Sequence, residues 1–393
     1  MDVAGVDAYL ADCRALALQE IHEIIPKQER YRPILYDLML EYPLRHAKAL
    51  RPGLCIATCR ALGGPLQAVL RSAAVLELYH NAFLIHDDVE DGSESRRDQP
   101  TLHGLHGTPI AVNVGDAMLA LALQPLLDNM RLIGMGKALR VLQTIARMAR
   151  ESAEGQALEL HWIRTSEWQL TDTDYLRMVY KKTSWYSFIT PILIGGLVAG
   201  AAPAQVSQLR KFAALLGMAF QIQDDVLNLT GEGSDYGKEI AGDLWEGKRT
   251  LLLLHAMRTI SPHERERAQS ILAKPRPLAA TGANGNGNGS GADCLTALLS
   301  ALEQRGEISP AAHQAIAAAL PHAPSGSDVK TPDDVQFLVK LMYRCGSVPY
   351  ARRVGQRLAA KAKQMLDSAT WLVPSVHREF LEGLVQFVTD RER

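Results

Sequence analysis

Apolar residues recur at intervals of three and four positions along most of the chain. One such run extends from Leu66 to Leu76 and leads up to Ile85, and another extends from Leu209 to Phe220. This spacing puts apolar side chains on one face of an α-helix. Neither the sustained alternation typical of strands nor the turn signals of βαβ units is present. The pattern therefore predicts an all-α fold.

One segment, at about residues 275–293, interrupts this pattern. It contains the run Gly-Ala-Asn-Gly-Asn-Gly-Asn-Gly-Ser-Gly, which has no side chains to bury and is typical of a flexible loop. Because no strand precedes it, the run does not fit a glycine-rich phosphate-binding loop. A helical pattern resumes near Leu295. We therefore expect a single domain over residues 1–393 that carries a flexible insertion.

The composition is that of a globular protein. Hydrophobic residues make up 47% of the 393 positions and charged residues 22%, with a formal net charge of -1. A chain of this charge has no overall basic field, so we expect no nucleic-acid partner. Any phosphate binding therefore depends on local clusters of charge.

No targeting or membrane signal is expected from the sequence. The first residues lack a basic and apolar leader. The apolar stretch best suited to span a membrane, Phe188 to Ala202, is too short and contains Gly and Pro, so we expect a buried helix. The five cysteines form neither a CxxC pair nor a metal-binding pattern with histidines. These features favour reduced thiols in a cytoplasmic protein without stable membrane insertion.

The first cluster of candidate functional residues lies at the end of an apolar helix. Asp87, Asp88 and Asp91 stand at positions i, i+1 and i+4, so Asp87 and Asp91 share one face. Like charges at this spacing repel, so we expect a cation to compensate them. Carboxylate oxygens suit Mg²⁺, which often bridges a few carboxylates to substrate phosphates. On its own, the cluster is equally compatible with a solvated acidic helix end.

A second cluster repeats this arrangement later in the chain. Asp224 and Asp225 again end an apolar helix, and Asn228 takes the place of the third carboxylate. Helical bundles build metal sites from inward-facing carboxylates on separate helices. Two such clusters facing each other could hold a diphosphate through bridging metal ions.

The two clusters resemble the aspartate-rich motifs of the trans-isoprenyl diphosphate synthases, the polyprenyl synthetase family, and its short-chain members in particular. The similarity runs from about Tyr42 to Thr250, and more loosely over residues 350–393. The motifs that carry it occur in the family's order: Leu50-Arg51-Pro52, Asp87 to Asp91, Arg96-Arg97, Gly155-Gln156, Lys182-Thr183, Phe220 to Asp225, Gly237-Lys238 and Glu246 to Thr250. The resemblance implies a single helical bundle of the isoprenoid synthase type with a central cavity. It also implies a prenyltransferase that condenses isopentenyl diphosphate with dimethylallyl, geranyl or farnesyl diphosphate.

The same resemblance assigns roles at the allylic diphosphate. Asp87, Asp91 and Asp224 correspond to ligands of two or three Mg²⁺ ions, for which Mn²⁺ could substitute, and Asp88 belongs to the same catalytic motif. Further residues correspond to positions at the allylic substrate or the leaving diphosphate: Arg96, Lys182, Thr183, Gln221, Lys238 and Lys248. Metal ions and cations together would neutralise the charge that develops on the leaving group.

A second set of residues corresponds to positions that hold isopentenyl diphosphate, namely Lys48, Arg51, His80 and Arg97. Guanidinium groups suit phosphate oxygens because their planar fork of donors can bind two oxygens at once. Ala49 departs from the family pattern, since many members carry another basic residue there. The site would therefore rely on its remaining cations. The alternative for Arg96 and Arg97 is a pair of surface arginines in a loop.

Two positions before Asp87 bear on product length. Side chains four and five residues before it lie about one helical turn below the metals, roughly 6–8 Å at 1.5 Å per residue, where a bulky ring would stop the growing tail. In the family, members that stop at C15 usually carry an aromatic at the fifth position, whereas here Ala82 stands there and Phe83 stands at the fourth. This combination favours geranylgeranyl diphosphate, with farnesyl diphosphate as the alternative. Phe83 could equally pack in the core.

Two other classes of protein share some of these features. A class I terpene cyclase also ionises a prenyl diphosphate, but it needs no second diphosphate site of the kind that Arg51 and His80 indicate. A non-catalytic synthase subunit typically lacks the aspartate-rich motifs, whereas both persist here. Members of the family are usually homodimers, so we expect a homodimer.

Overall fold

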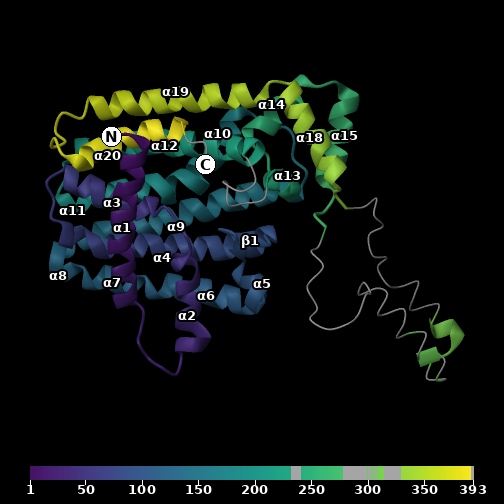
Figure 1. The fold of residues 1–393 in the computed structure, drawn as a ribbon, viewed down its shortest axis with the longest axis horizontal. Coiled ribbons are helices and arrows are strands. Elements are labelled where there is room, and N and C mark those ends of the chain that lie inside the picture. Colours follow the sequence, from purple (N-terminus) through teal and green to yellow (C-terminus); the bar gives the residue numbers. More distant parts are fainter. Residues whose placement is uncertain are drawn as a thin grey trace.

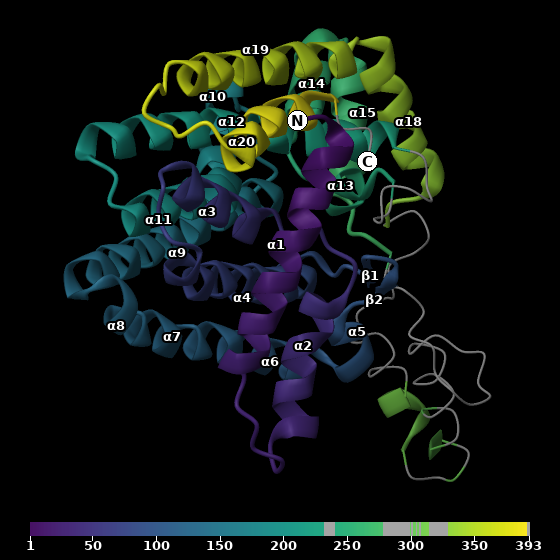
Figure 2. The same ribbon diagram turned by 60° about the vertical axis from the view of Figure 1, so that its left-hand side comes forward.

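The computed structural model describes residues 1–231, 240–277 and 329–390, together with 299, 302–303, 305 and 308–313. Within these residues the chain is almost entirely helical, as Figures 1 and 2 show. The predicted all-α fold is therefore confirmed. The run of Gly and Asn that we expect to be a flexible insertion lies outside the described residues, and so does Lys238.

The first half of the chain provides the helices that surround the first carboxylate cluster. In chain order they are α1 (Val3–Ile24), η1 (Arg32–Tyr36), α2 (Asp37–Leu44), α3 (Leu50–Ala61), α4 (Leu66–Asp91), α5 (Leu102–His106), α6 (Thr108–Leu121), α7 (Leu123–Asp128), α8 (Met130–Ile133) and α9 (Met135–Arg164). Of these, α1, α3 and α6 pack against α4.

The second half provides the helices that surround the second cluster. They are α10 (Asp172–Val179), η2 (Tyr180–Ile189), α11 (Thr190–Ala199), α12 (Pro203–Thr230), α13 (Gly242–Glu246), α14 (Leu251–Thr259), α15 (Pro262–Ala273), α18 (Pro332–Arg344), α19 (Ser347–Asp367) and α20 (Val376–Asp390). Here η2, α11 and α19 pack against α12. Both η1 and η2 are π-helices, a rare form whose hydrogen bonds join residues i and i+5.

The end of α4 fixes the position of the first cluster. Most side chains from Val69 to Ala82 on this helix are buried, which holds it in the centre of the bundle. Gly92 follows with a φ of 62° and ends the helix, because glycine adopts this left-handed conformation without a steric penalty. Asp87 and Asp91 therefore lie in the last turns of a well-anchored helix.

A short hairpin follows α4 directly. Strand β1 (Ser95–Arg96) pairs antiparallel with β2 (Gln99–Pro100). The two residues between them, Arg97 and Asp98, have φ values of 55° and 59°, as a type I′ turn requires. Because neither residue is glycine, this turn is locally strained, which is common at functional sites. The hairpin was not predicted from the sequence.

The most apolar long stretch differs from the one that we singled out in the sequence. Thr108–Ile133, 26 residues long, contains an 18-residue window with a mean hydropathy of 1.6 and is long and apolar enough to cross a membrane, so the choice of residues 188–202 as the best candidate was wrong. The stretch consists of three successive helices, α6 to α8. One such stretch is weak evidence for a membrane span, and only 39% of this window is buried in the bundle. Residues 190–198 of α11, by contrast, are buried as expected.

The four cysteines in the described part of the chain are free thiols. Cys13, Cys55 and Cys59 are buried, and burial raises the pKa of Cys59 to about 11. A thiol with such a pKa stays protonated at neutral pH and is a poor nucleophile. These cysteines therefore fit the expected role as core residues.

Candidate active site

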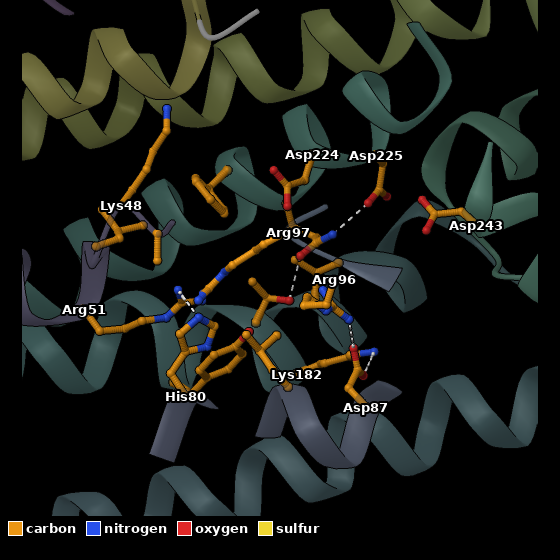
Figure 3. Close-up of a pocket in the computed structure, with 18 of the residues that line it drawn as sticks. Lys48, Arg51, His80, Asp87, Arg96, Arg97, Lys182, Asp224, Asp225 and Asp243 are labelled. Atoms are coloured by element: carbon orange, nitrogen blue, oxygen red, sulfur yellow. Dashed lines mark hydrogen bonds and ion pairs between the residues drawn. The ribbon is translucent and has the colours of Figure 1, made fainter. Parts of the chain in front are cut away.

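The centre of the bundle encloses a cavity of about 600 Å³, which Figure 3 shows in close-up. Its walls come mainly from α3, α4, η2 and α12. It is lined by most of the residues predicted from the sequence: Lys48, Arg51, His80, Asp87, Arg96, Arg97, Lys182, Thr183, Gln221, Asp224 and Lys248. Asp91 lines a neighbouring cavity of about 310 Å³, together with Asp87 and Lys248. The fold thus gathers residues from distant parts of the sequence into one site.

Asp87 faces the cavity from α4 and meets a lysine from η2. The Nζ atom of Lys182 lies 3.4 Å from a carboxylate oxygen of Asp87 and also pairs with Glu159 on α9. Burial alone would lower the pKa of Lys182, but Asp87 and Glu159 raise it above its usual value. The ammonium group is therefore charged and already lies where an incoming anion would need it.

Asp91, one helical turn further on, meets a second lysine. The Nζ atom of Lys248 lies 2.7 Å from a carboxylate oxygen of Asp91 and also pairs with Glu246. Burial raises the pKa of Asp91, while Lys248 acts in the opposite direction. The like charges of Asp87 and Asp91 repel each other and need cations nearby. Lys182 and Lys248, from other helices and loops, are these cations.

Asp88, the middle aspartate, turns away from the cavity. It is fully buried and accepts a 2.9 Å hydrogen bond from Nε of Arg96 and a second, short contact from the same guanidinium group. Tyr42 on α2 donates a further hydrogen bond of 2.6 Å to it. Asp88 lines neither of the two cavities. Its contacts hold Arg96 in position.

The hairpin after α4 presents two arginines to the cavity. Arg96 is held by Asp88, and its Nη2 atom also lies 3.9 Å from Asp87. Arg97 donates a 2.9 Å hydrogen bond to the backbone oxygen of Tyr42. Burial lowers the pKa of Arg97 to about 10, so this guanidinium is partly desolvated and would gain from an anionic partner.

The backbone of this hairpin is fastened by α2. Nη1 of Arg45 donates a 3.0 Å hydrogen bond to the backbone oxygen of Arg96, and its Nη2 donates one of 2.8 Å to that of Pro100. The Tyr42 hydroxyl accepts a hydrogen bond from the amide of Leu102 at 3.1 Å. Side chains of α2 therefore fix the loop that carries both arginines.

The second cluster resembles the first only in part. Asp224 and Asp225 both line the cavity, although Asp225 is largely buried. Asp225 accepts a 2.6 Å hydrogen bond from Tyr175 on α10 and a 2.8 Å hydrogen bond from Gln221. Burial, with a further contribution from nearby Asp243, raises the pKa of Asp225. Gln221 also accepts a hydrogen bond of 2.8 Å from Thr183, which ties α12 to η2.

Asn228, in the place of the third carboxylate, has a structural contact. Its side-chain oxygen accepts a 3.2 Å hydrogen bond from the amide of Asp243, and its backbone oxygen accepts one of 2.7 Å from Ala241. These contacts bring Asp243 to the cavity, which it also lines. Asn228 therefore supplies no carboxylate of its own, but its contacts hold the carboxylate-bearing residue Asp243 at the cavity.

A separate group of side chains occupies the opposite end of the cavity, as Figure 3 shows. Nη1 of Arg51 donates a 3.0 Å hydrogen bond to Nε2 of His80, and Nη2 donates one of 2.7 Å to the hydroxyl of Ser187. The ring of Tyr186 lies 4.9 Å from the guanidinium carbon of Arg51. Arg51 and His80 therefore form one preorganised unit, since each fixes the other.

Lys48 is oriented differently from Arg51 and His80. It points away from them in Figure 3. Its Nζ atom lies 4.6 Å from the ring centre of Phe387 on α20 and 3.7 Å from a carboxylate oxygen of Asp7 on α1. Lys48 still lines the cavity, at the side where the first and last helices meet.

A glycine explains how Lys182 comes so close to α4 and α9. A Cβ atom on Gly155 of α9 would lie 2.3 Å from the backbone nitrogen of Lys182. Only glycine permits this approach of the two helix backbones. The contact lets Lys182 reach Glu159 on the next turn of α9.

The sequence matches the profile of one protein family over residues 32–280, which is more than half of the chain; the family is the polyprenyl synthetase family. The chain belongs to it. The resemblance drawn from the motifs is therefore confirmed.

Individual members of the polyprenyl synthetase family agree with this assignment. A short chain isoprenyl diphosphate synthase of Methanocaldococcus jannaschii is 32% identical over 254 residues, which are 65% of this chain and 74% of that protein. An octaprenyl diphosphate synthase of Escherichia coli is 35% identical over 224 residues, or 57% of this chain and 65% of that protein. The crystal structure of a geranylgeranyl pyrophosphate synthetase from Pyrococcus horikoshii has a TM-score of 0.75 and 25% identity, and covers 98% of both chains. The isoprenoid synthase fold and the assignment to the prenyl diphosphate synthases are thus confirmed.

The two positions tied to product length lie behind the cavity wall. Ala82 is fully buried in an apolar cluster that includes Ala111 and Val114 of α6. Phe83 is half-buried, and its ring centre lies 5.7 Å from that of Tyr186, which lines the cavity. Neither Ala82 nor Phe83 lines the cavity itself. Phe83 therefore lies behind Tyr186 and not in the cavity itself.

Members of the polyprenyl synthetase family use a divalent metal, and the residues of this site fit one. Asp87, Asp91 and Asp224 offer carboxylate oxygens to the two adjoining cavities. Among the described residues, no three His, Cys, Asp or Glu side chains lie close enough together to hold an ion. Mg²⁺ commonly binds one or two carboxylates and completes its shell with water and substrate phosphates. The donor set therefore fits Mg²⁺ when a diphosphate supplies the remaining oxygens.

Several residues of the site were missed in the sequence. Glu159 follows Gly155 by one helical turn, so helical spacing could have placed both on the face towards Lys182. Tyr42 and Tyr175 carry no such signal, because their partners are 46 and 50 residues away in the sequence. Asp243 reaches the site through the backbone contacts of Asn228, which no local pattern reveals.

Proposed function

We propose that the protein condenses isopentenyl diphosphate with an allylic diphosphate, and that its main product is geranylgeranyl diphosphate. The observation that carries the proposal is that one cavity holds two separate cationic groups. Lys182 and Lys248 lie among the carboxylates, and Arg51 with His80 lies at the other end. An enzyme that ionises a single diphosphate has no use for the second group, which argues against a terpene cyclase.

The first step in this proposal breaks the allylic C–O bond. Asp87, Asp91 and Asp224 would hold two or three Mg²⁺ ions, which would supply electrostatic stabilisation of the departing diphosphate. Lys182 and Lys248 exchange their carboxylate partners for diphosphate oxygens, and Arg96 adds a guanidinium that Asp88 holds in place. Lys238 belongs to the same group by resemblance to the family. These cations act where the negative charge develops.

The second step forms the new carbon–carbon bond. Arg51, His80, Arg97 and Lys48 bind the diphosphate of isopentenyl diphosphate, so that its double bond points at the allylic cation. The double bond attacks the cation, and a proton then leaves the carbon next to the new bond. The released diphosphate accepts this proton. In this proposal Gln221 lies beside the reacting carbons, and Thr183, which donates a 2.8 Å hydrogen bond to Gln221, holds the allylic diphosphate.

The apolar part of the cavity protects the cation from water. Leu84, Met178, Tyr186 and Phe220 are among the residues that line it. Exclusion of water prevents quenching of the cation to an alcohol. Tyr186, with Phe83 behind it, forms an aromatic wall that limits the tail to about the length of geranylgeranyl diphosphate; farnesyl diphosphate is the alternative product.

We further propose that the protein acts as a homodimer in the cytoplasm. Large apolar side chains are exposed on α6 to α8 and at the start of α9: Ile110, Val112, Leu123, Leu127, Leu132, Met135 and Leu139. Such a concentration of exposed apolar surface is typical of a protein interface. The high hydropathy of residues 108–133 agrees with this role, since a two-fold contact would bury the same face on both subunits. The reduced state of the described cysteines agrees with a cytoplasmic site.

Product identification tests the proposed activity. The purified protein is incubated with Mg²⁺, isopentenyl diphosphate and either dimethylallyl, geranyl or farnesyl diphosphate, and the products are dephosphorylated and separated by chain length. We expect geranylgeraniol as the main alcohol. A cyclic hydrocarbon, or the absence of any elongated product, would contradict the proposal, and a main product of fifteen carbons would correct the chain length alone.

A further inference from the structure

Helix α19 lies at the edge of the bundle, along the top of Figures 1 and 2. One of its faces packs against α12 through small and apolar residues such as Ala351, Gly355 and Leu366. The opposite face is exposed and carries cations: Arg352, Arg353, Arg357, Lys361 and Lys363. This set of five is called the basic face below.

The charge of the basic face is not balanced by acidic residues. No Asp or Glu occurs between Asp334 and Asp367, whereas this interval contains seven Lys and Arg residues. Gln208 of α12 donates a 2.8 Å hydrogen bond to the backbone oxygen of Met365, and two further exposed cations, Arg210 and Lys211, follow Gln208 on α12. The chain as a whole has a net charge of -1. Positive charge is therefore concentrated on this side of the molecule.

Internal ion pairs do not account for this concentration. Lys363 pairs with Asp367 at 2.7 Å. Within the part of the chain that the structure describes, the other four cations of the basic face form no ion pair. Arg353, Arg357 and Lys361 are spaced four residues apart, so they repel one another along one side of the helix. A partner with many negative charges would remove this repulsion.

The turn after α19 carries two exposed apolar side chains. Val373 and Val376 are 48% and 50% exposed, and the turn is anchored by a 2.7 Å hydrogen bond from the amide of Val373 to the backbone oxygen of Ala61. A basic helical face with neighbouring apolar side chains is typical of proteins that lie on a membrane surface. Nucleic acid would attract the cations, but it has no apolar layer in which aliphatic side chains of this kind could be buried.

We propose that the basic face and the following turn bind the surface of an anionic lipid bilayer. The cations lie on the lipid headgroups, and Val373 and Val376 enter the interfacial layer. Binding of this kind is peripheral and reversible, because it depends on surface charge and shallow apolar contacts. The face of α6 to α9 proposed for dimer formation is made by other helices, so dimer formation leaves the basic face exposed. If the proposed activity holds as well, the enzyme would release its apolar product beside a bilayer.

Vesicle sedimentation of the full-length protein tests the proposal. Vesicles of phosphatidylcholine with added phosphatidylglycerol should bind the protein, and vesicles of pure phosphatidylcholine should not. Added salt should weaken the binding, because it screens exposed charges. The triple variant Arg353→Glu/Arg357→Glu/Lys361→Glu should lower the partition coefficient by roughly 100-fold or more, since each basic residue near an anionic surface contributes to the affinity.

A matched control reverses the same number of charges elsewhere. Lys27, Arg30 and Arg32 are exposed and lie beyond the C-terminal end of α1. The variant Lys27→Glu/Arg30→Glu/Arg32→Glu should bind vesicles as the unmodified protein does. Both triple variants should retain the helical circular dichroism and the catalytic activity of the unmodified protein, since none of these side chains lines the cavity.

A second variant tests the apolar part of the proposal. Val373→Ser/Val376→Ser should reduce vesicle binding by a factor that added salt does not change. Equal binding to neutral and anionic vesicles, or equal loss in both triple variants, would overturn the proposal. So would salt-sensitive binding to duplex DNA that anionic vesicles fail to displace, which would assign the basic face to nucleic acid.

Discussion

The hydroxyl of Tyr42 lies 2.6 Å from the carboxylate of Asp88, to which it donates a hydrogen bond. The second cluster repeats this contact, with Tyr175 donating to Asp225 at the same distance of 2.6 Å. In each cluster the second aspartate is bonded to a buried tyrosine on a preceding helix. Asp88 lines neither cavity, whereas Asp225 lines the central cavity beside Asp224. The tyrosines therefore fix the second aspartate of each cluster in the protein.

Loss of the Tyr42 hydroxyl should loosen the arginine hairpin. Tyr42→Phe removes a donor from Asp88 and leaves the amide of Leu102 without its acceptor. We expect the free energy of unfolding to fall by about 1–3 kcal/mol, as for other buried polar groups that lose a partner, and KM for the allylic substrate to rise. Denaturant unfolding and steady-state kinetics measure both. Tyr31→Phe, at a largely exposed ring, is the control, and equal stability of the two variants would show that the Tyr42 hydroxyl does not hold the loop.

Removal of either cavity-facing aspartate should abolish most of the activity while the helical fold survives. Asp87→Ala and Asp224→Ala each remove a proposed metal ligand, and we expect kcat to fall by roughly 100-fold or more, as when other transition-state contacts are lost. A chelator should abolish the activity of the unmodified protein. Asp333→Ala, at an exposed position on α18, should leave kcat unchanged. Activity that persists in the presence of the chelator would contradict the role proposed for the metal.

The two cationic groups should affect different substrates. Arg51→Ala or His80→Ala should raise KM for isopentenyl diphosphate by roughly 10- to 100-fold, because hydrogen bonds to charged groups contribute about 1.5–3 kcal/mol. Lys182→Ala should raise KM for the allylic substrate instead. Since Arg51 and His80 are bonded to each other at 3.0 Å, the double variant should cost less than the sum of the single variants. An equal rise of both KM values in every variant would show that the cavity is not divided in this way.

Product length should respond to Phe83. Phe83→Ala removes the ring that supports Tyr186, and we expect longer products by chromatography of the dephosphorylated alcohols. On helical spacing alone, Ala82→Phe would place a bulky ring in the path of the tail and shorten the product. Because Ala82 is fully buried against α6, we now expect this variant to lose about 1–3 kcal/mol of stability through overpacking. An unchanged product spectrum in Phe83→Ala would place the limit on the tail elsewhere in the cavity.

A charged side chain on the apolar face of α6 to α9 should produce a monomer. Leu132 and Met135 are 60% and 68% exposed, so Leu132→Glu/Met135→Glu should not disturb the fold of the subunit. Light scattering should report a dimer for the unmodified protein and a monomer for the variant. Ile34→Glu, at a residue that is 65% exposed on η1, should remain dimeric. A monomeric unmodified protein at micromolar concentration would refute the proposed assembly.

The sequence was sufficient for the helical fold and for most of the residues that line the central cavity. Apolar periodicity identifies buried helices, because one face of each must pack against its neighbours. The aspartates at 87, 91 and 224 could be found because their spacing is helical and each cluster ends an apolar helix. The matching cations could be assigned only through the family resemblance, since Lys182 and Lys248 are far from Asp87 and Asp91 in the chain.

Other parts of the site depend on features that produce no periodic pattern in the sequence. The arginine hairpin turns through two residues with positive φ, neither of which is glycine, so the usual Asn-Gly signal is missing. The tyrosine partners of Asp88 and Asp225 are fixed by the packing of α2 and α10. These features depend on tertiary contacts and therefore could not be predicted from local sequence patterns.

The π-helix η2 makes the length of one segment as important as its composition. Lys182, Thr183 and Tyr186 line the cavity, whereas Trp185 and Phe188 are buried in the core. Successive residues of an α-helix are rotated by about 100° at 3.6 residues per turn. If the segment kept its π-helical hydrogen bonds, deleting one residue between Tyr180 and Ile189 would rotate everything on one side of the deletion by about that angle. Lys182 could then no longer face the cavity while Trp185 and Phe188 face the core. An insertion or deletion here would therefore be far more damaging than most substitutions.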